Sequence, residues 1–101
     1  MVKLIVQYCH PKDPEAFEKY YAETHLPIAS KIPGVVKVEV SKVVGTPDGS
    51  KASQYRMAEL YFNSMEDLQK NMGAPEGQAA VNDIANFATG GVDVMVAEVQ
   101  G

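Results

Sequence analysis

The sequence has few of the residues that build covalent or metal-bound frameworks. It contains one cysteine, Cys9, two histidines, His10 and His25, and no tryptophan. A single cysteine cannot form a disulfide within the chain, and two histidines without neighbouring ligands at metal-binding spacing make a weak metal set. Phosphate-binding glycine patterns are absent too. We therefore expect no metal, no cofactor and a reducing compartment, the cytoplasm.

Clustered positive charge is also lacking. Nine Lys and Arg residues stand against thirteen Asp and Glu residues, for a net charge of -4. Nucleic-acid binding requires clustered Lys and Arg, so we expect no nucleic-acid partner. No apolar run approaches the ~20 residues that cross a bilayer. The N-terminus also lacks the pattern of a signal peptide, so we expect no membrane partner.

The residues that are present are typical of one globular domain, residues 1–101, with 46% hydrophobic and 22% charged side chains. Residues that alternate between apolar and polar predict strands, and apolar residues at helical spacing predict helices. Asp13 and Ser64 suit helix N-caps. These patterns predict strands over residues 2–9, 35–44, 53–62 and 92–99, and helices over residues 14–25, 28–32, 64–72 and 81–88.

The segment from Tyr20 to Val35 carries a histidine two residues before a proline. Pro27 has no N–H to donate to the carbonyl four residues back, and it disfavours the α conformation at Leu26. We therefore predict that the first helix ends or kinks near His25.

The order β, α, β, β, α, β is typical of the ferredoxin-like α+β fold, with both helices on one face of a four-stranded antiparallel sheet. Even-numbered strand positions are apolar and should lie under the helices. The odd-numbered face is half apolar, which is unusual for a face in contact with water. We therefore predict a homodimeric α/β barrel whose facing sheets enclose a cavity. The apolar odd-numbered residues are Ile5, Val35, Val43, Tyr55, Met57, Tyr61, Met95 and Val99.

Three stretches resemble the EthD family, named after ethyl tert-butyl ether degradation: YYAETHLPIASKIPGV from Tyr20, RMAELYFNSMEDLQKNM from Arg56 and APEGQAAVNDIANFATGG from Ala74. The resemblance covers nearly the whole chain and implies a dimeric α/β barrel of ferredoxin-like subunits. It implies less about activity, because the wider group includes accessory proteins of ether breakdown, reductases, dehydratases, monooxygenases and isomerases. Its most specific residues are His25, Pro27, Ala58 to Phe62, Asp83, Asn86 and Phe87.

His25 is the main candidate catalytic residue, because an imidazole titrates near pH ~6.5 and can take or give a proton at physiological pH. At a helix break its ring could tip toward a cavity. The structural alternative is that the ring hydrogen-bonds a carbonyl freed by Pro27 and holds the kink. Cys9 would be a nucleophile only if it lay beside His25, and otherwise its thiol is inert.

The candidate binding residues lie mainly on the odd-numbered strand face. Tyr55, Met57 and Glu59 combine an aromatic ring, a thioether and a carboxylate, which suits a flat or apolar ligand with one polar group. Tyr55 is also a candidate catalytic partner of the histidine. The alternative is interface packing, with Glu59 paired to a lysine such as Lys3 or Lys37. The remaining candidate binding residues are Tyr21, Ser41 and Met95.

Asp83, Asn86 and Phe87 lie within four positions of one another at the end of the last helix, where they can meet on adjacent faces. We interpret them as capping and packing residues.

The sequence leaves open whether the protein is an enzyme. The first hypothesis is a small cofactor-independent enzyme that acts on an apolar or aromatic metabolite through His25. The second is a non-catalytic binding or accessory protein of a monooxygenase degradation pathway. The third is a structural dimer whose cavity is filled by its own side chains.

Overall fold

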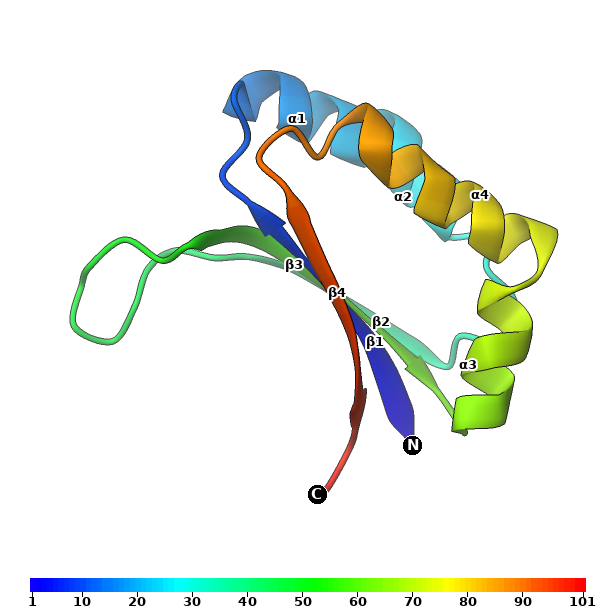
Figure 1. Cartoon of the computed structure of the whole chain (residues 1–101). Coiled ribbons are helices and arrows are strands. Elements are labelled where there is room, and N and C mark those ends of the chain that lie inside the picture. Colours follow the sequence, from blue (N-terminus) through cyan, green and yellow to red (C-terminus); the bar gives the residue numbers. More distant parts are fainter.

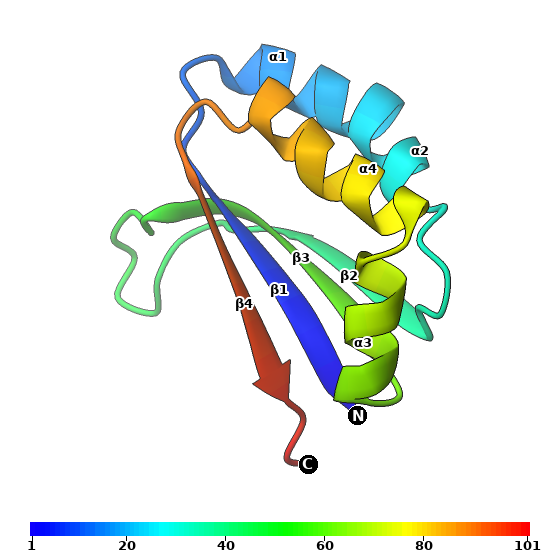
Figure 2. The same cartoon turned by 45° about the vertical axis from the view of Figure 1, so that its right-hand side comes forward.

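The computed structural model describes residues 1–101. Its strands are β1 (Val2–Cys9), β2 (Lys37–Lys42), β3 (Gln54–Phe62) and β4 (Val92–Glu98). Its helical segments are α1 (Pro14–Tyr20), the π-helical turn η1 (Tyr21–His25), α2 (Leu26–Ala29), α3 (Met65–Met72), α4 (Pro75–Asp83) and the 3₁₀ turn η2 (Ile84–Asn86). The strands form one sheet in the order β2-β3-β1-β4, and every neighbouring pair is antiparallel. All helices lie on one face of this sheet (Figures 1 and 2), so the predicted ferredoxin-like fold is confirmed.

The register divides the strand residues into two faces, because directly opposite residues of neighbouring strands share a face. One row on the helix side is Val40, Ala58, Val6 and Val94. One row on the other side, called the open face below, is Glu39, Glu59, Ile5 and Met95. The even-numbered positions of β1 are buried, as predicted. On the edge strands the even-numbered side chains also lie on the helix side, as predicted, but Val38 and Val94 are 54% and 53% exposed.

β3 departs from strict alternation. Its pairing with β1 shifts by one residue after Tyr8, where β3 has the extra residue Tyr55, and this is the pattern of a β-bulge. Tyr55 is only 8% exposed, and its ring packs edge-on against Phe17 of α1 with centroids 5.3 Å apart. The prediction that Tyr55 shares a face with Met57 is therefore wrong, because the bulge turns Tyr55 toward the helices.

The predicted end or kink near His25 takes the form of a π turn: α1 ends at Tyr20 and η1 ends at His25, while the helical run from Pro14 to Ala29 continues without a break. The N–H of Leu26 donates to the carbonyl of Tyr21, five residues back, which is the π-helical pattern. This wider turn places Pro27, which has no N–H, within the first turn of α2. The π turn, which ends at His25, thus allows the helix to continue through Pro27.

The predicted caps are confirmed. The carboxylate of Asp13 accepts from the N–H of Ala16 at 3.2 Å, and the hydroxyl of Ser64 accepts from the N–H of Asp67 at 3.1 Å.

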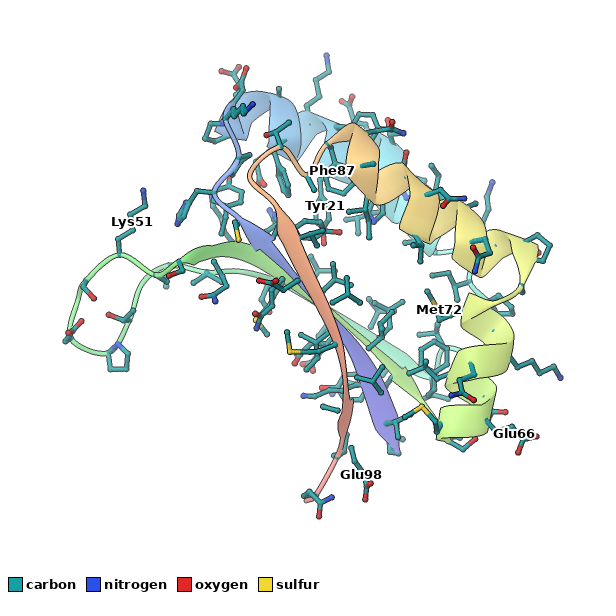
Figure 3. The ribbon with its side chains drawn as sticks, viewed as in Figure 1. Tyr21, Lys51, Glu66, Met72, Phe87 and Glu98 are labelled. Atoms are coloured by element: carbon teal, nitrogen blue, oxygen red, sulfur yellow. The ribbon has the colours of Figure 1, made fainter.

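The helices do not lie flat on the sheet. At one end, the rings of Tyr8, Phe17, Tyr21 and Phe87 pack together with centroid distances of 5.2 to 5.8 Å. At the other end, α3 is the helix that packs directly against β1 and β3. Figure 3 shows Tyr21 and Phe87 near one end of the space between helices and sheet and Met72 of α3 near the other. The helix layer is supported at two ends, and an apolar space lies between them.

Candidate functional site

A cavity of about 480 Å³ lies between the helices and the helix-side face of the sheet. All four strands contribute to its floor, while η1, α2 and α4 contribute to its roof. Sixteen of its 18 lining residues are hydrophobic, and none is Lys, Arg, Asp or Glu. A concave, apolar space of this volume with few polar groups is typical of a small-molecule site. The cavity suits an uncharged ligand.

His25 is the main polar group in this lining. His25 is the last residue of η1 and is 5% exposed. The imidazole stacks on the ring of Tyr21, with centroids 5.7 Å apart and planes 17° apart, and it packs against Phe87 at 4.6 Å. The π turn and the aromatic neighbours therefore fix the position of the imidazole at the wall of the cavity.

Asp83 holds the far side of the imidazole. Nδ1 of His25 donates to Oδ2 of Asp83 at 2.9 Å. Oδ1 of the same carboxylate accepts from the Tyr20 hydroxyl at 2.6 Å and from the Asn86 amide at 3.0 Å. A carboxylate on Nδ1 selects the tautomer with the proton on Nδ1 and a free lone pair on Nε2. This arrangement makes Nε2 a proton acceptor.

The carboxylate of Asp83 stays ionised. Burial alone would raise its pKa, but the hydrogen bonds from Tyr20, Asn86 and His25 outweigh burial and hold the pKa below its ordinary value. An ionised partner also stabilises the imidazolium that forms when Nε2 takes a proton. The pair can therefore act as a base and then return the proton as an acid.

Two buried tyrosines adjoin the imidazole. The hydroxyl of Tyr8 lies 3.5 Å from Nε2 of His25. Burial, with the nearby Tyr21 and Asp83 charges, raises the pKa of Tyr8 well above its ordinary value. Burial also raises the pKa of Tyr21 to about 12, and the Tyr21 hydroxyl is buried without a hydrogen-bond partner. Both phenols therefore remain protonated at neutral pH.

The candidate residues from the sequence divide between the two faces of the sheet. His25 and Tyr21 both line the cavity. Tyr55 is buried beneath α1 and does not line it. The other candidates lie on the open face, where Glu59 pairs with Lys3 at 3.0 Å. These open-face candidates are Ser41, Met57, Glu59 and Met95.

Two residues of the site were missed by sequence reasoning. The interpretation of Asp83 as a capping residue is wrong, because its side chain makes no cap bond to η2 and binds His25 instead. The signal that could have found it is the shared specificity of His25, Asp83 and Asn86 within the EthD resemblance. Tyr8 was assigned only to a strand, and no local signal separates its hydroxyl from that of any other buried tyrosine.

Cys9 and His10 do not join the site. Strand alternation places the Cys9 side chain on the face opposite Tyr8, away from His25. A ring N–H of His10 donates to the carbonyl of Ala52 at 2.8 Å. No three His, Cys, Asp or Glu side chains gather in a metal-binding group. None of the helices has the length and apolar character needed to cross a membrane.

Known proteins are similar to this chain over nearly its full length. A family model described as the EthD domain matches residues 10–91. An uncharacterized 11.0 kDa protein of Rhodococcus erythropolis, from the thcB-thcC intergenic region, is 39% identical over 95 residues, which cover 94% of this chain and 91% of that protein.

Solved structures show the same similarity. The crystal structure of an ethyl tert-butyl ether degradation (EthD) family protein from Bacillus halodurans C-125 superposes with a TM-score of 0.93 at 39% identity, covering 99% of both chains. A dimeric protein of unknown function from Bacteroides fragilis has a TM-score of 0.67 at 17% identity over 97% of this chain and 95% of that one. That second likeness shows the ferredoxin-like fold alone. The chain belongs to the EthD family.

Proposed function

We propose that this EthD-family protein binds an uncharged, apolar or aromatic small molecule in the helix-side cavity, where His25 acts as an acid or base without a cofactor. The observation that carries the proposal is the 2.9 Å bond between His25 and Asp83 at the wall of a cavity whose lining holds no charged residue. His25 combines burial, a titratable group and a place in the cavity lining, which is typical of a functional site.

The chemistry follows from the tautomer. Nε2 of His25 removes a proton from the ligand, and the resulting imidazolium is stabilised by the carboxylate of Asp83 in surroundings of low polarity. Returning that proton to another carbon isomerises the ligand, while delivering it to a departing hydroxyl group releases water. Both outcomes balance without an added oxidant or reductant.

The alternative is a non-catalytic carrier or accessory protein of a degradation pathway. The predominance of hydrophobic residues, 16 of the 18 in the lining, favours this function, because it suits retention of an apolar molecule without any reaction. We place either activity in the cytoplasm, in keeping with a single free cysteine.

The proposal includes a homodimer formed through the open face. Met95 is 40% exposed there and Val99 is 37% exposed, and a protein of the same fold from Bacteroides fragilis is dimeric. A second copy would cover these side chains without closing the helix-side cavity, because the cavity lies on the other face of the sheet.

Hydrogen–deuterium exchange of 2-tetralone, an uncharged bicyclic ketone, tests the acid–base function. We expect the protein to accelerate exchange of the hydrogens beside the carbonyl in deuterated buffer, measured by proton NMR. The variant His25→Gln should lose the acceleration, and Tyr61→Phe on the open face should keep it. Binding without acceleration would favour the carrier, and the absence of binding by any uncharged aromatic probe would contradict both functions.

A further inference from the structure

The polar end of the cavity presents one hydrogen-bond donor and one acceptor side by side. Because Asp83 takes the Nδ1 proton, Nε2 of His25 offers a lone pair. The neighbouring Tyr8 hydroxyl, whose pKa is raised, offers a proton. The two atoms are 3.5 Å apart, which is beyond the ~2.7 to 3.2 Å of a good hydrogen bond to nitrogen. Each group is therefore a poor hydrogen-bond partner for the other.

Bulk water has little access to these two side chains. Tyr8 is 1% exposed and His25 is 5% exposed, yet both line the cavity. Buried polar atoms in folded proteins nearly always find a partner, and one left without a partner destabilises the fold. A molecule in the cavity is therefore placed to donate a hydrogen bond to Nε2 of His25 and to accept one from the Tyr8 hydroxyl.

A hydroxyl group fits this pair. Its hydrogen donates to Nε2 of His25 while its oxygen accepts from the hydroxyl of Tyr8. A carbonyl oxygen would satisfy Tyr8 alone, and an ether oxygen would leave Nε2 without a donor. A charged group would enter a lining that holds no residue of opposite charge. The rings of Tyr21 and His25 stack on each other in the cavity lining, and this aromatic surface favours contact with a flat molecule.

We propose that the cavity selects an uncharged, flat molecule with a hydroxyl group on an sp² carbon, a phenol or an enol, and that Tyr8 and Nε2 of His25 bind that hydroxyl. This inference rests on the proposed function and names its ligand class. In the reaction the ligand O–H bond breaks, its electron pair stays on oxygen, and an Nε2–H bond forms. The new oxyanion accepts from the Tyr8 hydroxyl, and the imidazolium is stabilised by Asp83.

Three probes of nearly equal shape test the inference: 2-naphthol, 2-methoxynaphthalene and naphthalene. Their affinities are measured by NMR titration of the full chain. We expect 2-naphthol to bind about tenfold or more tightly than 2-methoxynaphthalene, which corresponds to about 1.4 kcal/mol. In Tyr8→Phe this preference should fall to about twofold while the naphthalene affinity stays unchanged. Tyr61→Phe, which removes an open-face hydroxyl, should keep the preference.

A second variant keeps the test decisive if Tyr8→Phe folds poorly. In Asp83→Asn the amide donates to Nδ1, so Nε2 carries the proton and becomes a donor. The preference for 2-naphthol over 2-methoxynaphthalene should then disappear. Equal binding of these two probes to the unaltered protein, or an unchanged preference in both variants, would overturn the inference and leave the proposed function standing. Failure of all three probes to bind would overturn the proposed function itself.

Discussion

The two faces of the sheet differ in how far their polar groups are buried. On the helix side, a buried network of polar contacts surrounds Asp83 and His25 beside an apolar cavity. On the open face, charges are spread in pairs that solvent reaches, such as Lys3 with Glu59 at 3.0 Å and Lys37 with Glu39 at 3.8 Å. Water can replace a lost partner on the open face but not in the buried network. Incompletely paired groups on the helix side therefore indicate where a ligand binds.

Removing the centre of the buried network should have the largest effect. Asp83→Ala leaves the His25 ring, the Tyr20 hydroxyl and the Asn86 amide without their acceptor. We expect a loss of about 3 kcal/mol in the free energy of unfolding, measured by urea denaturation. Glu59→Ala is the matched change on the open face and should shift the denaturation midpoint only slightly. Equal losses in the two variants would mean that the faces do not differ as described.

Filling the cavity should separate binding from stability. Ala58 lies at the centre of the helix-side row between Val40 and Val6 and lines the cavity. We expect Ala58→Leu to fold with a stability within about 1.5 kcal/mol of the unaltered protein. Its affinity for 2-naphthol should fall at least tenfold, or about 1.4 kcal/mol. Met57→Leu, one position away on the open face, should leave the affinity unchanged, and a loss there would move the site to that face.

Lowering the pH should destabilise the fold by protonating Asp83. Because the pKa of Asp83 is lower in the folded chain than its ordinary value of 3.8, its contribution to stability is fully present well above that value. It is lost as the pH falls through the folded pKa. Urea denaturation between pH 6 and about pH 3 should show a steeper loss for the unaltered protein than for Asp83→Asn. Parallel curves would show that Asp83 gains nothing from its buried partners.

The smallest expected effect is a gain in stability on the substitution Tyr21→Phe. The Tyr21 hydroxyl is buried without a partner, so Tyr21→Phe removes a polar atom that burial penalises. We expect the free energy of unfolding to rise by about 1 kcal/mol, measured in the absence of ligand. Tyr61→Phe on the open face loses a hydroxyl that donates to Glu39 at 2.7 Å, and this variant should show no gain. A destabilised Tyr21→Phe would reveal a partner for that hydroxyl.

The sequence predicts the strands and the starts of α1 and α3 well because those signals are local. The start of α4 was predicted wrongly, because this helix begins at Pro75 and not at residue 81. Period-two alternation locates β1, and Asp13 and Ser64 mark helix starts through bonds to residues three positions on. Pro27 is also a local signal, but its outcome depends on whether the chain ends the helix or inserts a π turn. Packing of the Tyr21 and His25 rings favours the π turn over a helix end, and this packing cannot be predicted from a local sequence pattern.

The site was less predictable because its contacts join distant positions. His25 and Asp83 are 58 residues apart, and each has an ordinary local explanation as a kink residue and a capping residue. The location of the cavity depends on how far the helices stand from the sheet. Alternation identifies the helix-side residues but not whether helices pack on them, so a cavity on the open face was the natural expectation.

The methionines provide the most direct test of the central claim that the ligand binds on the helix side. Met72 lines the cavity, while Met57 and Met95 lie on the open face. In a protein with carbon-13-labelled methionine methyl groups, titration with 2-naphthol should shift the methyl signal of Met72 and leave those of Met57 and Met95 in place. Shifts of Met57 and Met95 with a stationary Met72 would contradict the account and place the ligand between facing sheets.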